Sequence, residues 1–343
     1  MENTYQILKD VNLATRTTFG VPAQAARLVE VDSVAVLQEI IKSGESIQLI
    51  LGGGSNLLFT SDLTGLVLQN KILGREILEE QGDDVLIQFG GGENWHETVG
   101  WTLDQNLFGL ENLSLIPGTV GAAPIQNIGA YGVELMDRFE FLTAIELSSG
   151  KSFTFNRDAC NFAYRYSIFK GPAKGRFFIT SVTLRLSRKA ELNLDYGALK
   201  TILANKNIRD PKPKDVSEAV IEIRQQKLPD PKMLGNAGSF FKNPIIPLAQ
   251  FSRLKQLYPD VPSYPAGVGE VKVPAGWLIE KAGWKGKRIG NTGCHVDQAL
   301  VLVNYGNATG REIAAHAERV IHSVKKTFGI NLEKEVNVWG TPD

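Results

Sequence analysis

Residues 49–59 read LILGGGSNLLF, an apolar, strand-like segment that is interrupted by three consecutive glycines. Successive glycines let backbone N–H groups turn toward an anion with no β-carbon in the way, so such a loop can hold a phosphate without charged side chains. Ser55 and Asn56 add groups that donate or accept hydrogen bonds. The alternative is a turn between two strands that uses glycine for its positive φ angles. The spacing matches neither G-x-G-x-x-G nor the P-loop, which predicts a fold other than a Rossmann domain.

A second glycine-rich segment, IPGTVGAAPIQNIGAYGVEL at 116–135, carries no charge before Glu134. A surface loop of this length is normally more polar, whereas small residues suit close backbone approach to a flat cofactor and its pyrophosphate. The two segments together therefore favour a cofactor site over two purely structural loops. The residues expected to bind the cofactor are Gly52, Gly53, Gly54, Ser55, Asn56, Pro117, Gly118, Gly121, Ala122, Gln126, Asn127, Gly129 and Ala130.

The whole chain has 343 residues and an ordinary globular composition, with 43% hydrophobic and 22% charged residues. Lys plus Arg and Asp plus Glu both number 37, so the formal net charge is zero and indicates neither a nucleic-acid partner nor an anionic membrane surface. No apolar run approaches the roughly 20 residues that span a bilayer, so we expect a soluble protein with no membrane insertion. The length predicts two or three domains.

The first twenty residues lack the basic start and the apolar run of a secretory signal, and Cys160 and Cys294 are too few for a disulfide framework. We therefore expect a cytoplasmic protein. The four histidines are dispersed, and only His295 adjoins a cysteine, so we expect no metal site.

Hydrophobic patterning predicts a mixed α+β protein. The first hundred residues alternate strand-like and helix-like runs, at 26–31, 33–44, 46–59 and 65–70, and a strand from 84 leads through a glycine triplet into a helix with Trp95, Val99 and Leu103 on its apolar positions. Antiparallel strands are expected at 141–155 and 176–187, and a helix at 216–227 that two prolines end. A last helix is expected at 311–329, with His316 and His322 at its surface or boundary, before a strand that returns to a neighbouring sheet.

The two glycine segments resemble the FAD site of the UDP-N-acetylenolpyruvoylglucosamine reductases. The resemblance continues in order through YRYSIFK (164–170), KLPDPK (227–232), GNAGSFFKNP (235–244), AGWLIEKAGWKG (275–286), HVDQALVLVN (295–304) and LEKEV (332–336), and so covers nearly the whole chain. It implies an α+β, three-domain flavoenzyme of the FAD-binding type shared with vanillyl-alcohol-oxidase-like (PCMH-type) proteins. The implied parts are an FAD-binding α/β subdomain (1–70 plus 329–343), a second FAD-binding α+β domain (71–227) and a substrate-binding domain (228–328).

The resemblance also implies a reaction, the reduction of an enolpyruvyl ether by NADPH through a noncovalently bound FAD. Hydride adds to the β-carbon, and the carbanion that is left beside the carboxylate needs cationic stabilisation and one acid to protonate it. Ser239, between small residues in GNAGSFF, is the implied acid: a hydroxyl is a weak acid, but such a carbanion is a very strong base. Judged without the resemblance, Ser239 is better explained by a turn before a strand in FFKNP than by catalysis.

Two further catalytic residues are implied. Arg165 is the guanidinium expected to bind the enolpyruvyl carboxylate, a task suited to a planar donor of two parallel hydrogen bonds. Glu335, in LEKEV, is the implied catalytic carboxylate, which is expected to be protonated or paired during turnover because negative charge grows nearby. Without the resemblance, Arg165 would be interpreted as a surface ion-pair partner and Glu335 as an exposed strand residue.

The remaining implied residues would bind the UDP-sugar. They are Tyr196, Lys227, Asn243, Tyr264, Lys285 and Gln298. Tyr264 lies in the insert of the subclass whose tyrosine-bearing loop closes over the diphosphate. NADPH is expected to use much of the same pocket, so the two ligands would bind in turn with ping-pong kinetics. We expect a monomer.

Two other functions share part of this pattern. A flavin oxidase of the same broad fold would keep both glycine segments, but it often attaches flavin through histidine or cysteine, and neither occurs in 50–59 or 116–135. A nonenzymatic nucleotide-binding module could keep the glycines and lysines, but it would not need Ser239, Arg165 and Glu335 together.

Overall fold

The computed structural model describes residues 4–340, which fall into two compact units. Unit 1 comprises the described residues up to Val11, Ala25–Gly54 and Leu63–Gln226. Unit 2 comprises Asn12–Gln24, Ser55–Asp62 and the chain from Lys227 onward. Because the segment with three glycines ends one run at Gly54 and begins another at Ser55, it contributes residues to both units.

Unit 1 begins with a four-stranded sheet in the order β1-β2-β5-β3. Strand β5 lies between β2 and β3 and runs parallel to both. Helix α1 (Val34–Lys42) starts where the Ser33 hydroxyl accepts a hydrogen bond from the Val36 N–H, and it buries Leu37 and Ile40. The strands are β1 (Leu8–Asn12), β2 (Gln24–Val31), β3 (Ile47–Leu51) and β5 (Leu63–Asn70).

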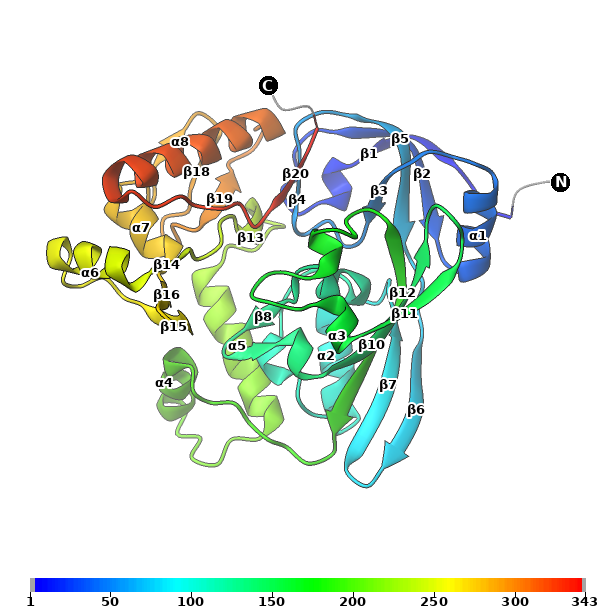
Figure 1. Cartoon of the computed structure of the whole chain (residues 1–343), viewed down its shortest axis with the longest axis horizontal. Coiled ribbons are helices and arrows are strands. Elements are labelled where there is room, and N and C mark those ends of the chain that lie inside the picture. The colour runs from blue at the N-terminus through cyan, green and yellow to red at the C-terminus, as the bar shows by residue number, and fades with distance from the viewer. Residues whose placement is uncertain (1–3, 341–343) are drawn as a thin grey trace. The chain divides into compact units, whose positions relative to one another are not determined.

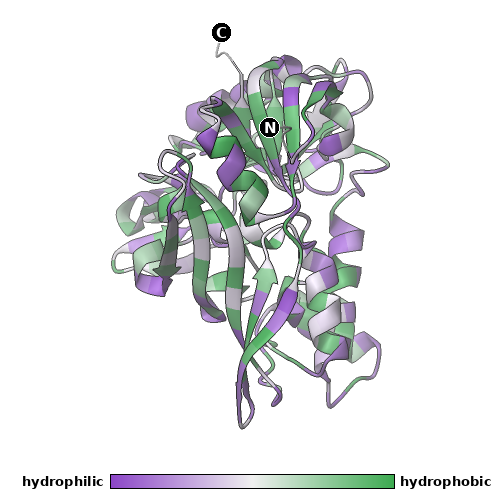
Figure 2. Cartoon of the chain, turned by 90° about the vertical axis from the view of Figure 1, so that its right-hand side faces the viewer, coloured by the Kyte–Doolittle hydropathy of each residue, from purple (hydrophilic) through white to green (hydrophobic). Residues whose placement is uncertain are grey.

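A five-stranded antiparallel sheet forms the larger part of unit 1, in the order β11-β10-β12-β7-β6. Buried hydrophobic residues lie along β7, β10 and β12, whereas the edge strand β6 is exposed throughout, and green and purple stretches alternate along the strands in Figure 2. Helix α2 (Trp95–Asp104) packs Trp95 and Val99 into the core with Phe89 of β7. The strands are β6 (Arg75–Gln81), β7 (Asp84–Gly90), β10 (Phe139–Glu146), β11 (Ser152–Asn156) and β12 (Phe177–Ser187).

Shorter elements complete unit 1. Helices α4 and α5 form a separate core with Leu199, Val216 and Val220. The predicted helix at 216–227 begins earlier, at Pro213, because a proline fits the first turn, where its missing N–H would have no partner. The elements are β8 (Gly129–Ala130), β9 (Val133–Glu134), α3 (Arg157–Cys160), α4 (Gly197–Asn205), α5 (Pro213–Lys227) and the 3₁₀ helices Glu111–Leu113, Val120–Gln126, Leu135–Asp137 and Ile168–Lys170.

Unit 2 surrounds one hydrophobic core, into which helix α8 (Gly310–Phe328) inserts Ile313, Ala317 and Val320. Strands β20 (Asn337–Trp339) and β4 (Leu57–Phe59) pair in parallel although they lie near opposite ends of the sequence (Figure 1). The other elements are the 3₁₀ helix Ala14–Arg16, the sheet β13 (Gly235–Ser239), β19 (Val301–Asn304), β18 (Thr292–Cys294) and β17 (Arg288–Ile289), the sheet β14 (Ile245–Pro247), β16 (Glu270–Lys272) and β15 (Tyr264–Gly267), and helices α6 (Leu248–Leu257) and α7 (Ala275–Lys281).

Most predicted elements are present, and the return of the last strand to a neighbouring sheet is confirmed by its pairing with β4. One strand is misplaced in the prediction: it covers 235–239 rather than FFKNP, so Ser239 ends a strand instead of preceding one. The boundary near 227 coincides with the end of the longest run of unit 1. The three-part division itself stays a prediction.

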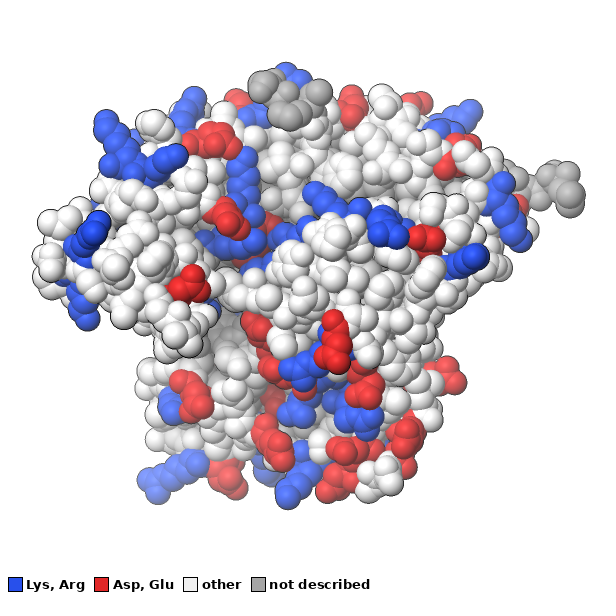
Figure 3. All heavy atoms as spheres, in the orientation of Figure 1, with Lys and Arg blue, Asp and Glu red and all other residues white. Residues whose placement is uncertain are grey.

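Basic and acidic side chains are interspersed on the face of the molecule in Figure 3, in keeping with the zero net charge. Between residues 4 and 340, no helix is long and apolar enough to cross a membrane. The same part of the chain holds no cluster of three or more His, Cys, Asp or Glu side chains that could bind a metal ion.

The expected surface position of His316 is wrong, because its side chain is 0% exposed. It lies on the buried face of α8, between Ile313 and Val320 at helical spacing. Its Nδ1 is 3.0 Å from the Thr292 hydroxyl, and its Nε2 is 3.7 Å from Cys294 Sγ. Because both ring nitrogens have neighbours inside the core, the polar side chain can be buried there.

Burial lowers the pKa of His316 from 6.5 to about 4. Because the unfolded chain binds a proton more readily, this histidine should cost no stability above pH 6.5 and progressively more as the pH falls toward 4, up to about 3 kcal/mol. We expect the free energy of unfolding, measured by urea titration from pH 4 to 8, to fall less steeply below pH 6.5 in His316→Gln than in the wild type. His322→Gln, at an exposed position of the same helix, should keep the wild-type slope; an unchanged slope in His316→Gln would contradict this assignment.

Candidate functional site

The two glycine segments predicted to bind a cofactor lie against each other in unit 1. A β-carbon on Gly53 would lie 2.8 Å from Gly118 Cα, and one on Gly52 would lie 2.7 Å from Thr119 Oγ1. Of the three consecutive glycines, only Gly54 has a positive φ, at +64°. Space therefore explains glycine at positions 52 and 53, and a turn conformation explains it only at Gly54.

A third glycine segment, Gly90–Gly92, holds the second one in place. The Gly121 N–H donates to the Gly91 carbonyl at 2.8 Å, and the Val120 N–H donates to the Glu93 carbonyl at 2.9 Å. A β-carbon on Gly121 would come within 2.9 Å of the Gly91 oxygen. The sequence showed this glycine triplet, but sequence reasoning did not assign it to the site.

Polar side chains in 116–135 differ in their hydrogen-bond partners. Asn127 is fully buried with a φ of +46°; it accepts from the Met136 N–H at 3.0 Å and donates to Glu134 at 2.8 Å. Asn127 thus organises the loop. Gln126 accepts a hydrogen bond from Lys170 at 3.1 Å. Thr119 Oγ1 is buried and has no hydrogen-bond partner among the described residues.

Arg165 is held at the turn between Ala163 and Tyr166, which pair with each other through their backbones. Its Nη2 donates to the Gly129 carbonyl at 2.7 Å. A β-carbon on Gly129 would lie 3.2 Å from Arg165 Nη1, so glycine permits this close approach. The predicted carboxylate-binding arginine therefore lies beside the cofactor-loop residue Gly129 within unit 1.

Arg224 and Tyr131 join this group and were missed by sequence reasoning. Arg224 Nε donates to the Leu115 carbonyl at 3.2 Å, and its guanidinium also hydrogen-bonds Tyr131. Burial lowers the pKa of Arg224 and raises the pKa of Tyr131. The Tyr131 ring meets that of the predicted substrate residue Tyr196 edge to face, with centroids 5.0 Å apart. One feature of the sequence could have indicated that Arg224 faces inward: it lies four residues after the buried Val220, on the same face of the helix.

Positive φ angles are concentrated in this part of unit 1. Leu115, Asn127, Tyr131 and Arg165 have φ values of 57°, 46°, 50° and 53°. A side chain in this conformation is strained unless its surroundings fix it, and strain of this kind gathers at functional sites. The backbone therefore supports a binding role for the loop independently of its glycines.

In unit 2, the structure brings three predicted residues together: Asn56, Ser239 and Glu335. Ser239 ends β13 opposite Val301, after a bulge in which Gly238 has a φ of +67°. The Glu335 N–H donates at 2.8 Å to the carbonyl of Phe240, the residue after Ser239. Asn56 Nδ2 donates to the Glu335 carbonyl at 3.2 Å. The proposed acid and the proposed catalytic carboxylate thus lie on neighbouring backbone segments.

The other predicted substrate residues of unit 2 are spread over several elements. Asn243 Oδ1 accepts from the Ala275 N–H at 2.9 Å and so fixes the start of α7. Lys285 pairs with Glu280 at 3.2 Å. The Gln298 Oε1 would lie 3.3 Å from a β-carbon on Gly276. Tyr264 is 52% exposed on β15, and Lys227 is the last residue of α5.

The class of protein follows from the fold and from the glycine segments. Residues 25–156 match the model of a protein family that is described as an FAD binding domain. A crystal structure of UDP-N-acetylenolpyruvylglucosamine reductase from Thermus caldophilus has the same fold, with a TM-score of 0.67 at 23% identity over 98% of this chain and 100% of that one. The predicted fold class is confirmed: this is an α+β protein with an FAD-binding domain of the non-Rossmann type.

The family follows from its relatives. Residues 230–339 match the C-terminal domain of UDP-N-acetylenolpyruvoylglucosamine reductase. Proteins of that name from Flavobacterium johnsoniae and Pseudomonas aeruginosa are 50% and 47% identical over 97% of this chain and 99% of each relative. The chain therefore belongs to the UDP-N-acetylenolpyruvoylglucosamine reductase family.

The residues of unit 1 fit a bound FAD. Glycines 52, 53 and 121 let the loops pack backbone against backbone, and the buried hydroxyl of Thr119, which has no partner among the described residues, can still make a hydrogen bond to a ligand. The glycine segments at 52–54 and 118–121 would hold the cofactor.

A methyl group at Gly53 should disturb this packing, since it would meet the backbone of Gly118 rather than a flexible side chain. Overpacking of this kind typically costs 1–3 kcal/mol, so we expect Gly53→Ala to weaken FAD binding about tenfold or more. Gly100→Ala is the matched control, because a β-carbon there, in helix α2, would meet nothing within 4 Å. Titration of each apoprotein with FAD measures both affinities, and equal affinities would contradict the proposed role of Gly53.

Proposed function

We propose that this protein catalyses the NADPH-dependent, FAD-mediated reduction of UDP-N-acetylglucosamine enolpyruvate to UDP-N-acetylmuramate, a step in bacterial peptidoglycan synthesis. The names of the relatives support the substrate class. The observation that carries the proposal is the 2.8 Å hydrogen bond from the Glu335 N–H to the Phe240 carbonyl, which brings the backbone of Glu335 next to the residue that follows Ser239. A module that only bound a nucleotide would not need this pair.

The reaction consists of a hydride transfer and a proton transfer. The glycine segments at 52–54 and 118–121 would hold FAD, which when bound would supply hydride transfer from NADPH to the β-carbon of the enolpyruvyl double bond, with NADP⁺ as the other product. The electron pair of that bond then resides on the α-carbon next to the carboxylate. Ser239 Oγ donates its proton to this carbon, and solvent restores the proton to the serine oxygen. Position at the end of a strand, after a glycine with positive φ, gives this hydroxyl a fixed location beside small residues.

Arg165 stabilises the charge that grows during hydride addition. Its hydrogen bond to the Gly129 carbonyl fixes the guanidinium plane, and a guanidinium so oriented can donate to a carboxylate. We assign to Arg165 the binding of the enolpyruvyl carboxylate.

Glu335 and the residues for the UDP end complete the proposal. Glu335 is assigned to polarise or orient the enol, and its backbone is already fixed by Phe240 and Asn56. Lys227, Asn243, Lys285 and Gln298 are assigned to the diphosphate, and Tyr196 and Tyr264 to the rest of the substrate. A cytoplasmic location, a monomeric state and the absence of a nucleic-acid partner stay predictions.

The reaction is tested by reducing the flavin with NADPH in the absence of oxygen and then adding UDP-N-acetylglucosamine enolpyruvate. We expect rapid reoxidation, seen as recovery of the flavin absorbance near 450 nm. A flavin that stays reduced until oxygen is admitted would favour an oxidase, and a protein unable to bind flavin would contradict both glycine-segment assignments.

The role of Ser239 is tested by following the two half-reactions of Ser239→Ala separately. Loss of the proton donor should slow reoxidation by the enolpyruvyl substrate on the order of 10²-fold and leave flavin reduction by NADPH nearly unchanged. Ser252→Ala, at an exposed position of α6, should affect neither. Equal slowing of both half-reactions in Ser239→Ala would show that Ser239 is not the acid.

A further inference from the structure

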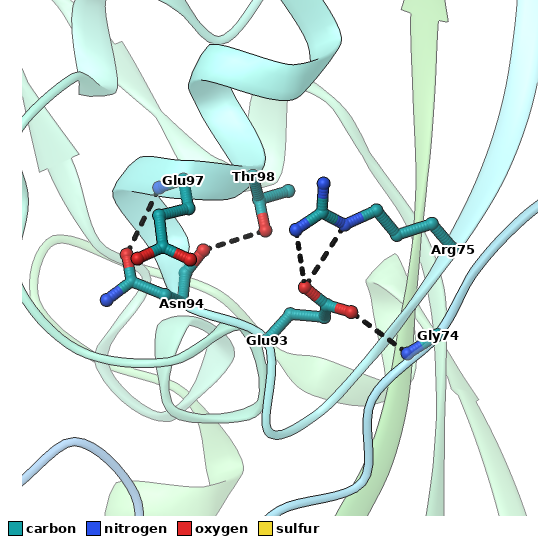
Figure 4. A network of polar contacts seen from close by, with 6 residues as sticks. All are labelled: Gly74, Arg75, Glu93, Asn94, Glu97 and Thr98. Atoms are coloured by element: carbon teal, nitrogen blue, oxygen red, sulfur yellow. Dashed lines mark hydrogen bonds and ion pairs between the residues drawn. The ribbon is translucent and has the colours of Figure 1, made fainter.

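Glu93 is a mostly buried carboxylate that none of the proposed catalytic steps uses. Its side chain is 10% exposed and forms an ion pair with Arg75, at 2.7 Å from Nη2 and 3.1 Å from Nε (Figure 4). The second carboxylate oxygen accepts from the Gly74 N–H at 2.9 Å. Arg75 also lies over the Trp101 ring, 5.3 Å from its centroid. Both oxygens of Glu93 therefore hold one short segment, Gly74–Arg75.

That segment lies beside the third glycine segment, Gly90–Gly92. A β-carbon on Gly90 would come within 2.4 Å of the Ile72 carbonyl oxygen, and one on Gly92 within 2.7 Å of the Ile72 nitrogen. The Gly90 N–H donates to the Gly74 carbonyl, and the Gly92 N–H to the Ile72 carbonyl, both at 2.8 Å. Because backbone meets backbone here, the Glu93 ion pair fixes how the glycine segment sits against residues 72–75.

The backbone of the same segment determines the position of the proposed flavin loop. The carbonyls of Gly91 and Glu93 accept from the Gly121 and Val120 N–H groups, and the Trp95 N–H donates to the Gly118 carbonyl at 3.1 Å. Residues 118–121 thus take their position from residues 91–95. A displacement of Glu93 would therefore move residues 118–121, the backbone that is proposed to contact the cofactor.

The neighbouring polar contacts serve a different purpose. Asn94 Oδ1 accepts from the Glu97 N–H at 3.1 Å, and the Thr98 hydroxyl donates to the Asn94 carbonyl at 2.8 Å (Figure 4). These contacts start helix α2. The Glu97 side chain takes no part in the ion pair, and the residue is exposed, which makes Glu97 a matched control for Glu93.

We propose that the Glu93–Arg75 ion pair is a positioning device for the flavin: it fixes residues 90–95 and, through them, the cofactor loop at 118–121, and so sets the affinity for FAD. Glu93 is a positioning residue, since it acts through the loop rather than on the cofactor. This inference rests on the proposed assignment of residues 118–121 to FAD binding.

The proposal is tested with Glu93→Gln, which keeps the size of the side chain. The amide can accept from Arg75 or from the Gly74 N–H with its one oxygen, but its NH₂ group then faces another donor, and Arg75 loses its counterion. We expect FAD dissociation, followed by the recovery of flavin fluorescence on dilution of the holoprotein, to indicate roughly tenfold to hundredfold weaker binding. Glu97→Gln should bind FAD like the wild type.

Two further measurements separate positioning from a general loss of stability. The double variant Arg75→Gln/Glu93→Gln, which has neither charge, should recover part of the affinity, as expected for coupled residues. In each variant, the free energy of unfolding of the apoprotein, measured with urea, should change less than the free energy of FAD binding does. Wild-type affinity in Glu93→Gln, or a loss matched by Glu97→Gln, would overturn the proposal. Because FAD binding is measured without NADPH or the UDP-sugar, that outcome would not bear on the proposed reaction.

Discussion

The close approach of the backbones at Gly53 and Gly118 is the constraint on which the candidate flavin site depends. A β-carbon on Gly53 would lie 2.8 Å from Gly118 Cα, a distance that real side chains essentially never show. Strand β3 must therefore be followed by glycine for the second segment to reach this loop. The second segment is itself held by Gly91 and Glu93, so three stretches that are distant in the sequence form one packed unit. A backbone-lined site of this kind needs few charged side chains.

Glycine is required for two different physical reasons in this chain: at some positions there is no space for a β-carbon, and at others the backbone has a positive φ. Gly52 and Gly53 have ordinary φ angles and are required for space, whereas Gly54 and Gly238 have φ values of +64° and +67°. Gly238 precedes the proposed acid Ser239, where the strand carries a bulge. A bulge redirects the next side chain out of the regular alternation of a strand. In the proposed cofactor loop, Gly52 and Gly53 are glycine because a β-carbon would clash with neighbouring atoms. Before Ser239, Gly238 is glycine because its φ is positive.

Much of the fold was predictable because local patterns specify it. The alternation at 26–31 and the glycine-terminated periodicity of 311–329 appear as β2 and α8 within two residues at each end. Contacts between distant residues were not predictable from one sequence. Three contacts depend on partners that no local pattern identifies. They are the ion pair of Glu93 with Arg75, the contact of Arg224 with Tyr131, and the contact of the buried His316 with Thr292. The motif at 235–244 predicted the importance of Ser239, but not that a strand ends there.

The proposed reaction needs both stabilisation of negative charge and delivery of a proton. In unit 1, backbone carbonyls hold two arginines, Arg165 at Gly129 and Arg224 at Leu115. In unit 2, the proposed acid Ser239 and the proposed carboxylate Glu335 lie on adjacent backbone segments. Hydride addition creates negative charge beside a carboxylate, which Arg165 is proposed to stabilise, whereas the proposed acid is needed only afterwards. Both tasks belong to reoxidation of the flavin by the enolpyruvyl substrate, and flavin reduction by NADPH needs neither, which is why Ser239→Ala is expected to impair one half-reaction and leave the other intact.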